Sequence, residues 1–287
     1  MPELPEVETI RRGLDKFIVK KEIVGVEVLS EKSWIGELVT GQVLGIRRFG
    51  KALVIDLKGG KSMMIHLRMT GQLIWRGMGK EFAGGHPSES FVDELPNKQT
   101  RVVIEFEDGV LYFNDQRKFG FIKVMPTPEI EEEAFIRKLA KEPWEMTGEE
   151  LYEQLRRHKN ALVKAVILDQ KVIAGLGNIY ADEALYRARI HPERKAGTVT
   201  VAEAKRLIKA AREAMEQSIE AGGSTMETYV KADGTRGDYL ELFAQVFNKQ
   251  GQACSRCGKE IVKIRVAGRG THICPNCQKI NRKEGGR

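Results

Sequence analysis

The chain has no long apolar run and little cysteine. None of its apolar stretches approaches the roughly 20 residues that a membrane-spanning helix needs, and the charged amino terminus lacks the apolar core of a signal peptide. We therefore expect no membrane partner and a cytoplasmic location, where thiols stay reduced. The sequence contains no internal repeat and no low-complexity tract.

What is present is a globular composition with an uneven distribution of charge. The 287 residues are 41% hydrophobic and 30% charged, which is enough for two domains and a small module. The net charge is +7, but residues 248–287 alone carry ten basic and two acidic side chains, which leaves the rest of the chain slightly negative. Such a tail favours a polyanionic partner, most often nucleic acid. The alternative is a solvated tail that only aids solubility.

The first three residues, Met1-Pro2-Glu3, are suited to covalent catalysis. Initiator methionine is readily trimmed before proline, and trimming would make the nitrogen of Pro2 a free secondary amine. An α-amino group has a pKa of about 8, against about 10.4 for lysine, so more of it is neutral and nucleophilic at pH 7. Such an amine can form a Schiff base, and the carboxylate of Glu3 can move protons in the same reaction. The alternative is the acidic first turn of an ordinary helix.

Hydrophobic periodicity divides the chain into a β-rich part and a helical part. Apolar residues at helical spacing after Pro5 predict one amphipathic helix to about residue 19. Over residues 22–124 the period is two, and Gly59-Gly60 and Asp108-Gly109 are typical hairpin turns, which predicts a β-sandwich. We expect a long loop over residues 78–98. After a linker at 126–128, the pattern predicts helices over residues 129–142, 148–158, 161–168, 178–188, 201–221 and 240–247.

All four cysteines lie near the carboxyl end. They form two pairs, Cys254-x2-Cys257 and Cys274-x2-Cys277, with sixteen residues between the pairs. Two such knuckles place four thiolates around one zinc ion (Zn2+), which is structural because no coordination position stays open. The alternative is a pair of disulfides, which a reducing cytosol disfavours. Between the knuckles, residues 261–266 and 271–273 predict a β-hairpin with Arg269 at its tip.

A glycine-rich turn precedes one of the predicted helices. Residues 173–178, IAGLGN, lead directly into it, so backbone N–H groups and the positive helix end would face an anion. Asn178 could bind phosphate there, or it could cap the helix in the ordinary way.

Five separated segments carry a specific resemblance that runs from Pro2 to Lys279: MPELPEVETIRRGL, HLRMTG, NDQRKFGF, IAGLGNIYADEAL and VAGRGTHICPNCQK. Together they resemble the formamidopyrimidine-DNA glycosylase family. The resemblance implies a multidomain α+β fold, with an amino-terminal helix and antiparallel β-sandwich over residues 1–126. A helix–two-turns–helix domain over 127–247 and a four-cysteine zinc ribbon finger over 248–287 would follow.

The resemblance also implies an activity and its substrate. The family consists of bacterial enzymes of base-excision repair that remove oxidised purines, namely 8-oxoguanine and formamidopyrimidines, from double-stranded DNA. They then cleave the abasic strand by β,δ-elimination, with no cofactor beyond structural zinc. The implied location is the bacterial cytosol or nucleoid, and we expect a monomer.

Four residues match the family's catalytic positions. Pro2 would attack C1′ of the damaged nucleotide, and Glu3 would donate and shuttle protons. Lys51, in RRFGKALVIDL, would hold a phosphate and support elimination, although an exposed strand lysine is the simpler interpretation of the residue alone. Arg269 would bind the phosphates that flank the lesion and assist δ-elimination.

Another three residues match the group that fills the gap left by an extruded base. Met69 and Phe119 would wedge the base stack while Arg117 bonds the orphaned cytosine. On hydrophobicity alone, Met69 and Phe119 could instead be core residues of strands. The loop over residues 222–239 would cover the extruded purine, and its glycines permit the φ angles that such a loop needs.

Lys159 and Asn178 match the family's phosphate contacts in the helical domain. Gln99 stands where the family usually has histidine, and we expect it to keep a phosphate contact. Thr70 stands where some members carry glutamate, so base recognition at that point is not carried over.

Two other functions stay open. An endonuclease VIII-like enzyme would prefer oxidised pyrimidines, although LPEVET and the long loop favour the purine branch. A non-enzymatic protein would bind DNA through the zinc finger and the basic tail alone.

Overall fold

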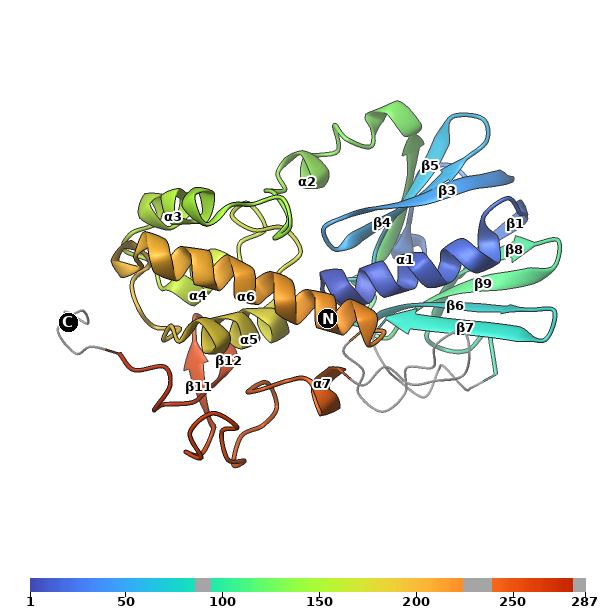
Figure 1. Cartoon of the computed structure of the whole chain (residues 1–287). Coiled ribbons are helices and arrows are strands. Elements are labelled where there is room, and N and C mark those ends of the chain that lie inside the picture. The colour runs from blue at the N-terminus through green and yellow to red at the C-terminus, as the bar shows by residue number, and fades with distance from the viewer. Residues whose placement is uncertain (86–93, 224–238, 281–287) are drawn as a thin grey trace. The chain divides into compact units, whose positions relative to one another are not determined.

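The computed structural model describes residues 1–85, 94–223 and 239–280, which form two compact units (Figure 1). Unit 1 comprises Met1–Arg137 and residues 219–223, and unit 2 comprises Lys138–Ser218 and residues 239–280. The predicted loop over residues 222–239 lies almost wholly outside the described residues.

Unit 1 is built from one long helix and two β-sheets. Its elements are α1 (Leu4–Ile18), β1 (Glu22–Val28), η1 (Glu31–Ser33), β2 (Trp34–Ile35), β3 (Gly41–Phe49), β4 (Ala52–Leu57), β5 (Lys61–His66), β6 (Gly71–Gly77), β7 (Lys80–Gly85), β8 (Thr100–Phe106), β9 (Gly109–Asp115), β10 (Phe121–Pro126), η3 (Thr127–Glu129) and α2 (Ala134–Arg137). One sheet has the order β2-β10-β5-β4-β3 and the other β1-β8-β9-β6-β7. Strands β1 and β3 join them, and every pairing is antiparallel except β2 with β10.

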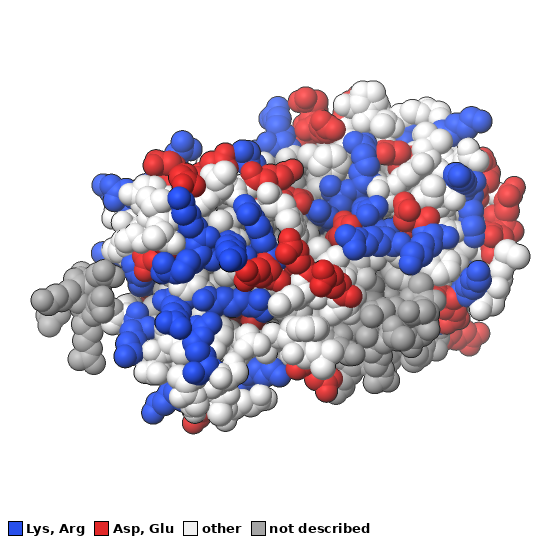
Figure 2. Space-filling model, in the orientation of Figure 1, with Lys and Arg blue, Asp and Glu red and all other residues white. Residues whose placement is uncertain are grey.

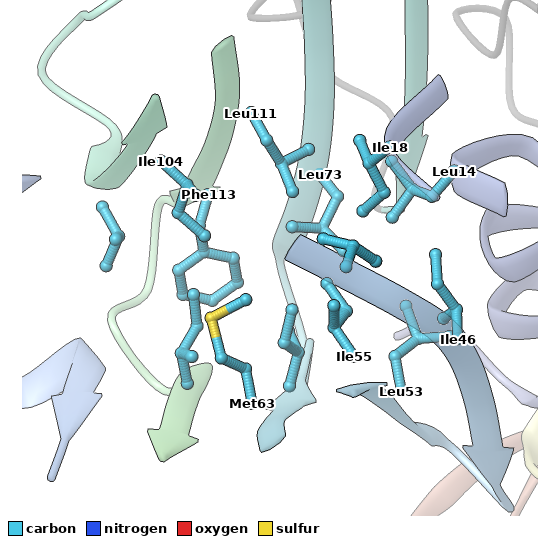
Figure 3. Packing of buried hydrophobic residues seen from close by; sticks show 14 of the residues in the cluster. Leu14, Ile18, Ile46, Leu53, Ile55, Met63, Leu73, Ile104, Leu111 and Phe113 are labelled. Carbon is cyan, nitrogen blue, oxygen red and sulfur yellow. The ribbon is translucent and has the colours of Figure 1, made fainter. Parts of the chain in front are cut away.

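The core of unit 1 lies between these two sheets, as the predicted β-sandwich requires. Figure 3 shows Leu53 and Ile55 of β4 in the same cluster as Leu111 and Phe113 of β9, although the strands belong to different sheets. Helix α1 buries its apolar residues in this cluster, among them Leu14, so the predicted amphipathic helix is confirmed.

The long loop predicted over residues 78–98 is wrong at its start, because β7 occupies residues 80–85 and pairs with β6. Met78 and Gly79 form the two-residue turn with φ of 50° and 72°, the conformation that suits a tight hairpin. The glycines of β7 look unfavourable for a strand but have a packing reason. A Cβ on Gly84 would come within 2.4 Å of Ile10 of α1.

Unit 2 consists mainly of helices and ends in a small hairpin. Its elements are α3 (Gly148–Arg157), α4 (Val163–Ile167), α5 (Asn178–Ala188), η4 (Ala196–Thr198), α6 (Val201–Glu220, whose last two residues belong to unit 1), α7 (Tyr239–Leu242), β11 (Val262–Val266) and β12 (Arg269–Ile273). Helices α3, α5 and α6 confirm three of the predictions, and α4 is a shorter form of a fourth. No helix within the described ranges is both long and apolar enough to cross a membrane.

Two predicted helices are largely wrong because tertiary hydrogen bonds take their backbone groups. Over residues 129–142 only α2 is α-helical, and the N–H of Ala140 donates to the carbonyl of Gln170. Over residues 240–247 the helix ends at Leu242, and the following N–H groups of residues 245–247 donate to the Glu183 carboxylate instead. Burial raises the pKa of Glu183, although these donors oppose the shift.

The hairpin near the carboxyl end is tighter than predicted. Its turn has two residues, Ala267 and Gly268, both with positive φ. Arg269 is therefore the first residue of β12, paired with Val266, and not the tip itself.

Candidate nucleic-acid interface and catalytic terminus

The amino terminus is buried from its second residue. Pro2 is buried, Glu3 is 2% exposed and only Met1 extends to solvent. The N–H of Glu3 donates to Oε2 of Glu6 at 2.8 Å, and the carbonyl of Glu3 accepts from the N–H of Val7. These bonds hold Glu3, and with it the adjoining Pro2, at the start of α1. The positive end of a helix favours a carboxylate at this place. Trimming of Met1 would thus leave the nitrogen of Pro2 beside the backbone of Glu3 at a rigid helix start.

A hairpin turn of two residues, Gly50 and Lys51, connects β3 and β4. Lys51 is 6% exposed, so it is not the ordinary exposed lysine of a strand. Arg48 ties this turn to α1, because its Nε donates to Glu8 at 3.0 Å and its Nη1 donates to the carbonyl of Gly50 at 3.1 Å. The first helix and the Lys51 turn therefore form one rigid assembly.

Glu8 of this assembly and His66 near Lys51 have shifted pKa values. Burial would raise the pKa of Glu8, but hydrogen bonds from Arg11, Arg12 and Arg48 outweigh it and lower the pKa to about 2. Burial, together with the charges of Arg68 and Lys51, lowers the pKa of His66 to about 3. His66 is thus neutral at pH 7, and its Nδ1 accepts from the N–H of Arg68 at 3.0 Å.

Met69, Arg117 and Phe119 lie in two turns that share hydrogen bonds. Met69 lies between β5 and β6, and the other two lie between β9 and β10. Met69 is 38% exposed and Phe119 is 55% exposed, so neither is the core residue that hydrophobicity alone would suggest. The Arg117 guanidinium lies 4.8 Å from the centroid of the Phe119 ring. Gln99 adjoins them, because its carbonyl accepts from the N–H of Asp115 at the end of β9.

Asn178 and Arg269 also lie close together, in unit 2. Asn178 is the first residue of α5, after the N-cap Gly177, so it is not the cap itself. Its Nδ2 donates to the carbonyl of Gly270 at 3.0 Å, next to the exposed Arg269. Lys159 is exposed in the turn after α3, where its carbonyl accepts from the N–H of Gly197.

The surface around this pair is basic. The hairpin exposes Lys263, Arg265 and Arg269. Figure 2 shows Lys and Arg side chains gathered over the part of unit 2 that contains α5 and this hairpin. A phosphate backbone is the natural partner of such a surface.

The four cysteines fit one tetrahedral zinc ion. Their sulfur atoms lie within 4.8 Å of one another, at 3.9 Å between Cys254 and Cys277 and 3.5 Å between Cys257 and Cys274. Four Zn–S bonds of about 2.3 Å in a tetrahedron require sulfur atoms about 3.8 Å apart. These thiolates would hold the hairpin, and they leave no ligand position for substrate.

Asp115, Lys164 and Asp182 are buried charges next to candidate site residues, and the sequence did not single them out. Each is 0% or 1% exposed. Lys164 Nζ donates to Asp182 at 2.6 Å and to Thr271 Oγ1 at 2.7 Å, which joins α4, α5 and β12. The available signal was position. Asp115 continues the inward alternation of Leu111 and Phe113, where a charge is costly unless it is bonded.

Known families and proteins match the whole of this architecture. The model of the formamidopyrimidine-DNA glycosylase N-terminal domain matches residues 1–122, that of the H2TH domain of the same enzyme matches residues 139–230, and that of a zinc finger found in FPG and IleRS matches residues 251–280.

Among curated proteins, the formamidopyrimidine-DNA glycosylase of Pelotomaculum thermopropionicum is 42% identical over 98% of this chain and 100% of its own length. That of Streptococcus pyogenes is 40% identical over 97% and 99%. Among solved structures, the complex of a Lactococcus lactis FPG mutant with Fapy-dG containing DNA has a TM-score of 0.86 at 35% identity, over 97% of this chain and 100% of that one. The complex of the Lactococcus lactis protein with abasic-site DNA has a TM-score of 0.85 at 34% identity, with the same coverage.

A helix-led β-sandwich, a helical unit and a zinc ribbon together define a helix–two-turns–helix protein with a zinc finger. The chain belongs to the formamidopyrimidine-DNA glycosylase family, whose members are bifunctional DNA glycosylases and AP lyases. The resemblance of the five sequence segments is thereby confirmed.

Proposed function

We propose that this chain is a base-excision repair enzyme that removes oxidised purines from double-stranded DNA through a Schiff base at Pro2 and then cleaves the abasic strand. One observation carries the proposal. A Pro-Glu pair, buried at the start of α1, stands at the head of a chain that aligns over nearly its whole length with formamidopyrimidine-DNA glycosylases.

The nitrogen of Pro2, once Met1 is removed, attacks C1′ of the damaged nucleotide. The bond from C1′ to the purine breaks, and the base leaves with a proton. The nitrogen of Pro2 then loses its own proton, the C1′–O4′ bond breaks as O4′ takes a proton from Glu3, and an iminium joins Pro2 to the opened sugar. Glu3 supplies and collects protons in these steps. Loss of a proton from C2′ then expels the 3′ phosphate, and a second elimination expels the 5′ phosphate. Water finally releases the sugar fragment.

Phosphates and the opposite strand are held by residues outside the terminus. Lys51 and Arg269 bind phosphates beside the lesion and stabilise the leaving oxygens. Gln99, Lys159 and Asn178 bind phosphates further along the strand. The zinc on Cys254, Cys257, Cys274 and Cys277 gives the hairpin that carries Arg269 its fold.

Met69, Arg117 and Phe119 occupy the space that the extruded nucleotide leaves. The two apolar side chains insert into the stack, and the guanidinium bonds the orphaned cytosine. We divide the chain accordingly into a catalytic domain (1–126), a DNA-binding domain (127–247) with a loop over the lesion (222–239), and a zinc finger (248–287). The enzyme works as a monomer on the chromosome in the bacterial cytosol.

Borohydride trapping tests the proposal. Purified protein, with its native terminus read by mass spectrometry, is mixed with an 8-oxoguanine:cytosine duplex and reduced. We expect a covalent protein–DNA adduct at residue 2, together with release of the base. Pro2→Gly keeps a terminal amine of lower basicity and should trap far less. A variant with an added residue ahead of Pro2, which makes the nitrogen an amide, should not trap at all.

Two outcomes would replace the proposal. Tight lesion binding without an adduct, from protein whose Met1 is gone, would make the chain a DNA-binding protein alone. Faster trapping on duplexes with oxidised pyrimidines than with 8-oxoguanine would place it in the endonuclease VIII-like branch.

A further inference from the structure

Asp115 is a buried carboxylate whose hydrogen-bond donors all come from two turns. It is 0% exposed. Its Oδ2 accepts from the N–H groups of Phe119 and Gly120, each at 2.7 Å. Its Oδ1 accepts from the N–H of Arg117 at 3.1 Å and from the hydroxyl of Thr70. A carboxylate that receives this many donors is firmly held.

The same donors belong to the predicted wedge residues or to their direct neighbours. Arg117 and Phe119 give their own backbone N–H groups. Met69 precedes Thr70, whose hydroxyl both donates to Asp115 and accepts from the N–H of Arg117 at 3.0 Å. One carboxylate and one hydroxyl therefore connect the turn that carries Met69 with the turn that carries Arg117 and Phe119.

The backbone of Asp115 is fixed as tightly as its side chain. Arg101, which is 7% exposed, donates from Nε to the carbonyl of Asp115 at 2.8 Å. The N–H of Asp115 donates to the carbonyl of Gln99 at 2.9 Å. Gly120 permits the close approach, because a Cβ there would lie 2.8 Å from the Phe113 ring. The carboxylate thus has little freedom to follow a moving loop.

Rigidity matters here because the side chains it presents are exposed and apolar. Met69 and Phe119 extend from turns, and turns are ordinarily more mobile than the strands that they connect. Ordering such a turn only when DNA binds would cost conformational entropy at the moment of base extrusion. A wedge that is already ordered in the free protein avoids that cost, so it fills the gap faster and holds the base out longer.

We propose that Asp115, acting with the hydroxyl of Thr70, is a positioning residue that preorganises Met69, Arg117 and Phe119 for insertion into DNA. The inference rests on the proposed function, since the wedge has a purpose only if a base is extruded. Asp115 is fully buried, so it is not available for direct contact with the sugar or the base. It acts on excision only through the two turns.

Three variants test this role in the full-length, zinc-loaded protein. Asp115→Asn keeps the shape of the side chain but places an NH2 group against backbone N–H donors, so one pair of hydrogen bonds is lost. Thr70→Val removes the hydroxyl that connects the turns, and Thr70→Ser retains it. Each protein is measured by single-turnover release of 8-oxoguanine, by fluorescence of a 2-aminopurine beside the lesion, and by borohydride trapping on a preformed abasic site.

We expect Asp115→Asn and Thr70→Val to slow base release and the rise of 2-aminopurine fluorescence by about tenfold or more, the scale of a lost hydrogen bond to a charged group. Trapping on the abasic site should stay within about twofold of wild type, because no base has to be unstacked there. Thr70→Ser should restore base release. A mere loss of fold would lower both reactions together and would not be rescued by serine.

Three results would overturn the inference. Both Asp115→Asn and Thr70→Val could release base at the wild-type rate, or trapping could fall as far as base release, or serine could be as defective as valine. If Asp115→Asn does not fold, the two Thr70 variants decide. Failure of the proposed function is distinguishable, because wild type itself would then neither release the base nor form an adduct.

Discussion

Two buried aspartates, one in each unit, accept hydrogen bonds near the candidate site residues, and they do so with different chemistry. Asp115 in unit 1 is satisfied by three backbone N–H groups and a hydroxyl. Asp182 in unit 2 faces the ammonium of Lys164 at 2.6 Å, with both side chains 0% exposed. Its second oxygen accepts from the N–H of His272 at 2.9 Å.

Asp115 fixes the shape of one turn, whereas Asp182 joins separate secondary-structure elements. Donors to Asp115 come mostly from the five residues that follow it, so its loss should distort a turn and leave the sandwich intact. Lys164 and Asp182 connect α4, α5 and the zinc hairpin through long-range contacts. Loss of either would leave an unpaired charge in the core of unit 2. We therefore expect Asp115 to matter more for base release and the Lys164–Asp182 pair more for stability.

Removal of zinc should give the largest contrast between the two regions. Apparent zinc binding to cysteine-rich modules contributes about 10–16 kcal/mol, so chelation should unfold residues 251–280. The N–H of His272, bonded to Asp182, should then exchange rapidly with deuterium, whereas those of Phe119 and Gly120 stay protected. Hydrogen exchange read by mass spectrometry, before and after zinc is restored, checks this. Equal loss of protection at His272 and at Phe119 and Gly120 would show that the two regions do not unfold independently.

Breaking the ion pair should come next in size. Lys164→Met leaves Asp182 buried without its cation and should lower the free energy of unfolding by about 3–5 kcal/mol. The double variant with Asp182→Asn should recover part of that loss. Urea titrations followed by circular dichroism measure both. Lys209→Met removes a lysine that is 77% exposed and should change stability by less than about 0.5 kcal/mol. If the Lys164→Met variant is as stable as this control, the Lys164–Asp182 pair contributes nothing to the free energy of unfolding.

Arg269→Ala should reverse the kinetic pattern expected for Asp115→Asn. Strand cleavage and phosphate binding should fall by about tenfold, while base release stays partly intact, because the proposed role of the side chain is to bind phosphates and not the base stack. The slope of log affinity against log salt should decrease by about one. Arg265→Ala, on the paired strand of the same hairpin, is the matched control and should change cleavage less. Cleavage and base release that are both untouched would remove Arg269 from the site.

The last effect concerns pH, and it tests His66, which accepts a hydrogen bond from the N–H of Arg68 just before Met69. The pKa of His66 is lowered to about 3 in the folded protein, so the unfolded chain binds the proton first as pH falls below about 6.5. Stability should therefore decrease from pH 6.5 towards 3, with a contribution from His66 of at most about 1.4 kcal/mol per pH unit. Protonation would also remove the acceptor for the N–H of Arg68.

Urea titrations between pH 7 and 4 measure this contribution through the two buried tryptophans of unit 1, Trp34 and Trp75, in a Trp144→Phe background. His66→Gln should show a shallower slope than its parent, since the carboxylates titrate alike in both proteins. Parallel slopes would mean that His66 does not titrate between the two states.

Local signals explain which predictions succeeded. The periodicity after Pro5 predicted α1, and the Gly-Asn turn placed the start of α5 correctly, because both depend on neighbouring residues. The cysteine spacing led to a cluster that fits zinc for the same reason. The failures occur where distant groups compete for the backbone. Glu183 takes the N–H groups that a helix over residues 240–247 would need.

For the candidate site, too, local sequence predicted some features and distant contacts decided others. Most of its residues lie in five short segments, but hydrophobicity could not decide whether Met69 and Phe119 are core or surface. Both are exposed, and the Asp115 carboxylate accepts a hydrogen bond from the backbone N–H of Phe119. The sequence marks Asp115 only by its inward position in a strand and does not indicate its partner Thr70, which lies 45 residues away.

The sequence by itself determined the Pro-Glu terminus, the cysteine cluster, the basic end of the chain and the family, because each depends on short stretches of the chain. Only the tertiary structure decided which buried charges are paired and which exposed side chains are held ready. Those outcomes depend on contacts such as Asp182 with His272, 90 residues apart, whose geometry exists only after the chain has folded. A buried charge is stable only where a partner meets it, and the chain order does not say which partner that will be.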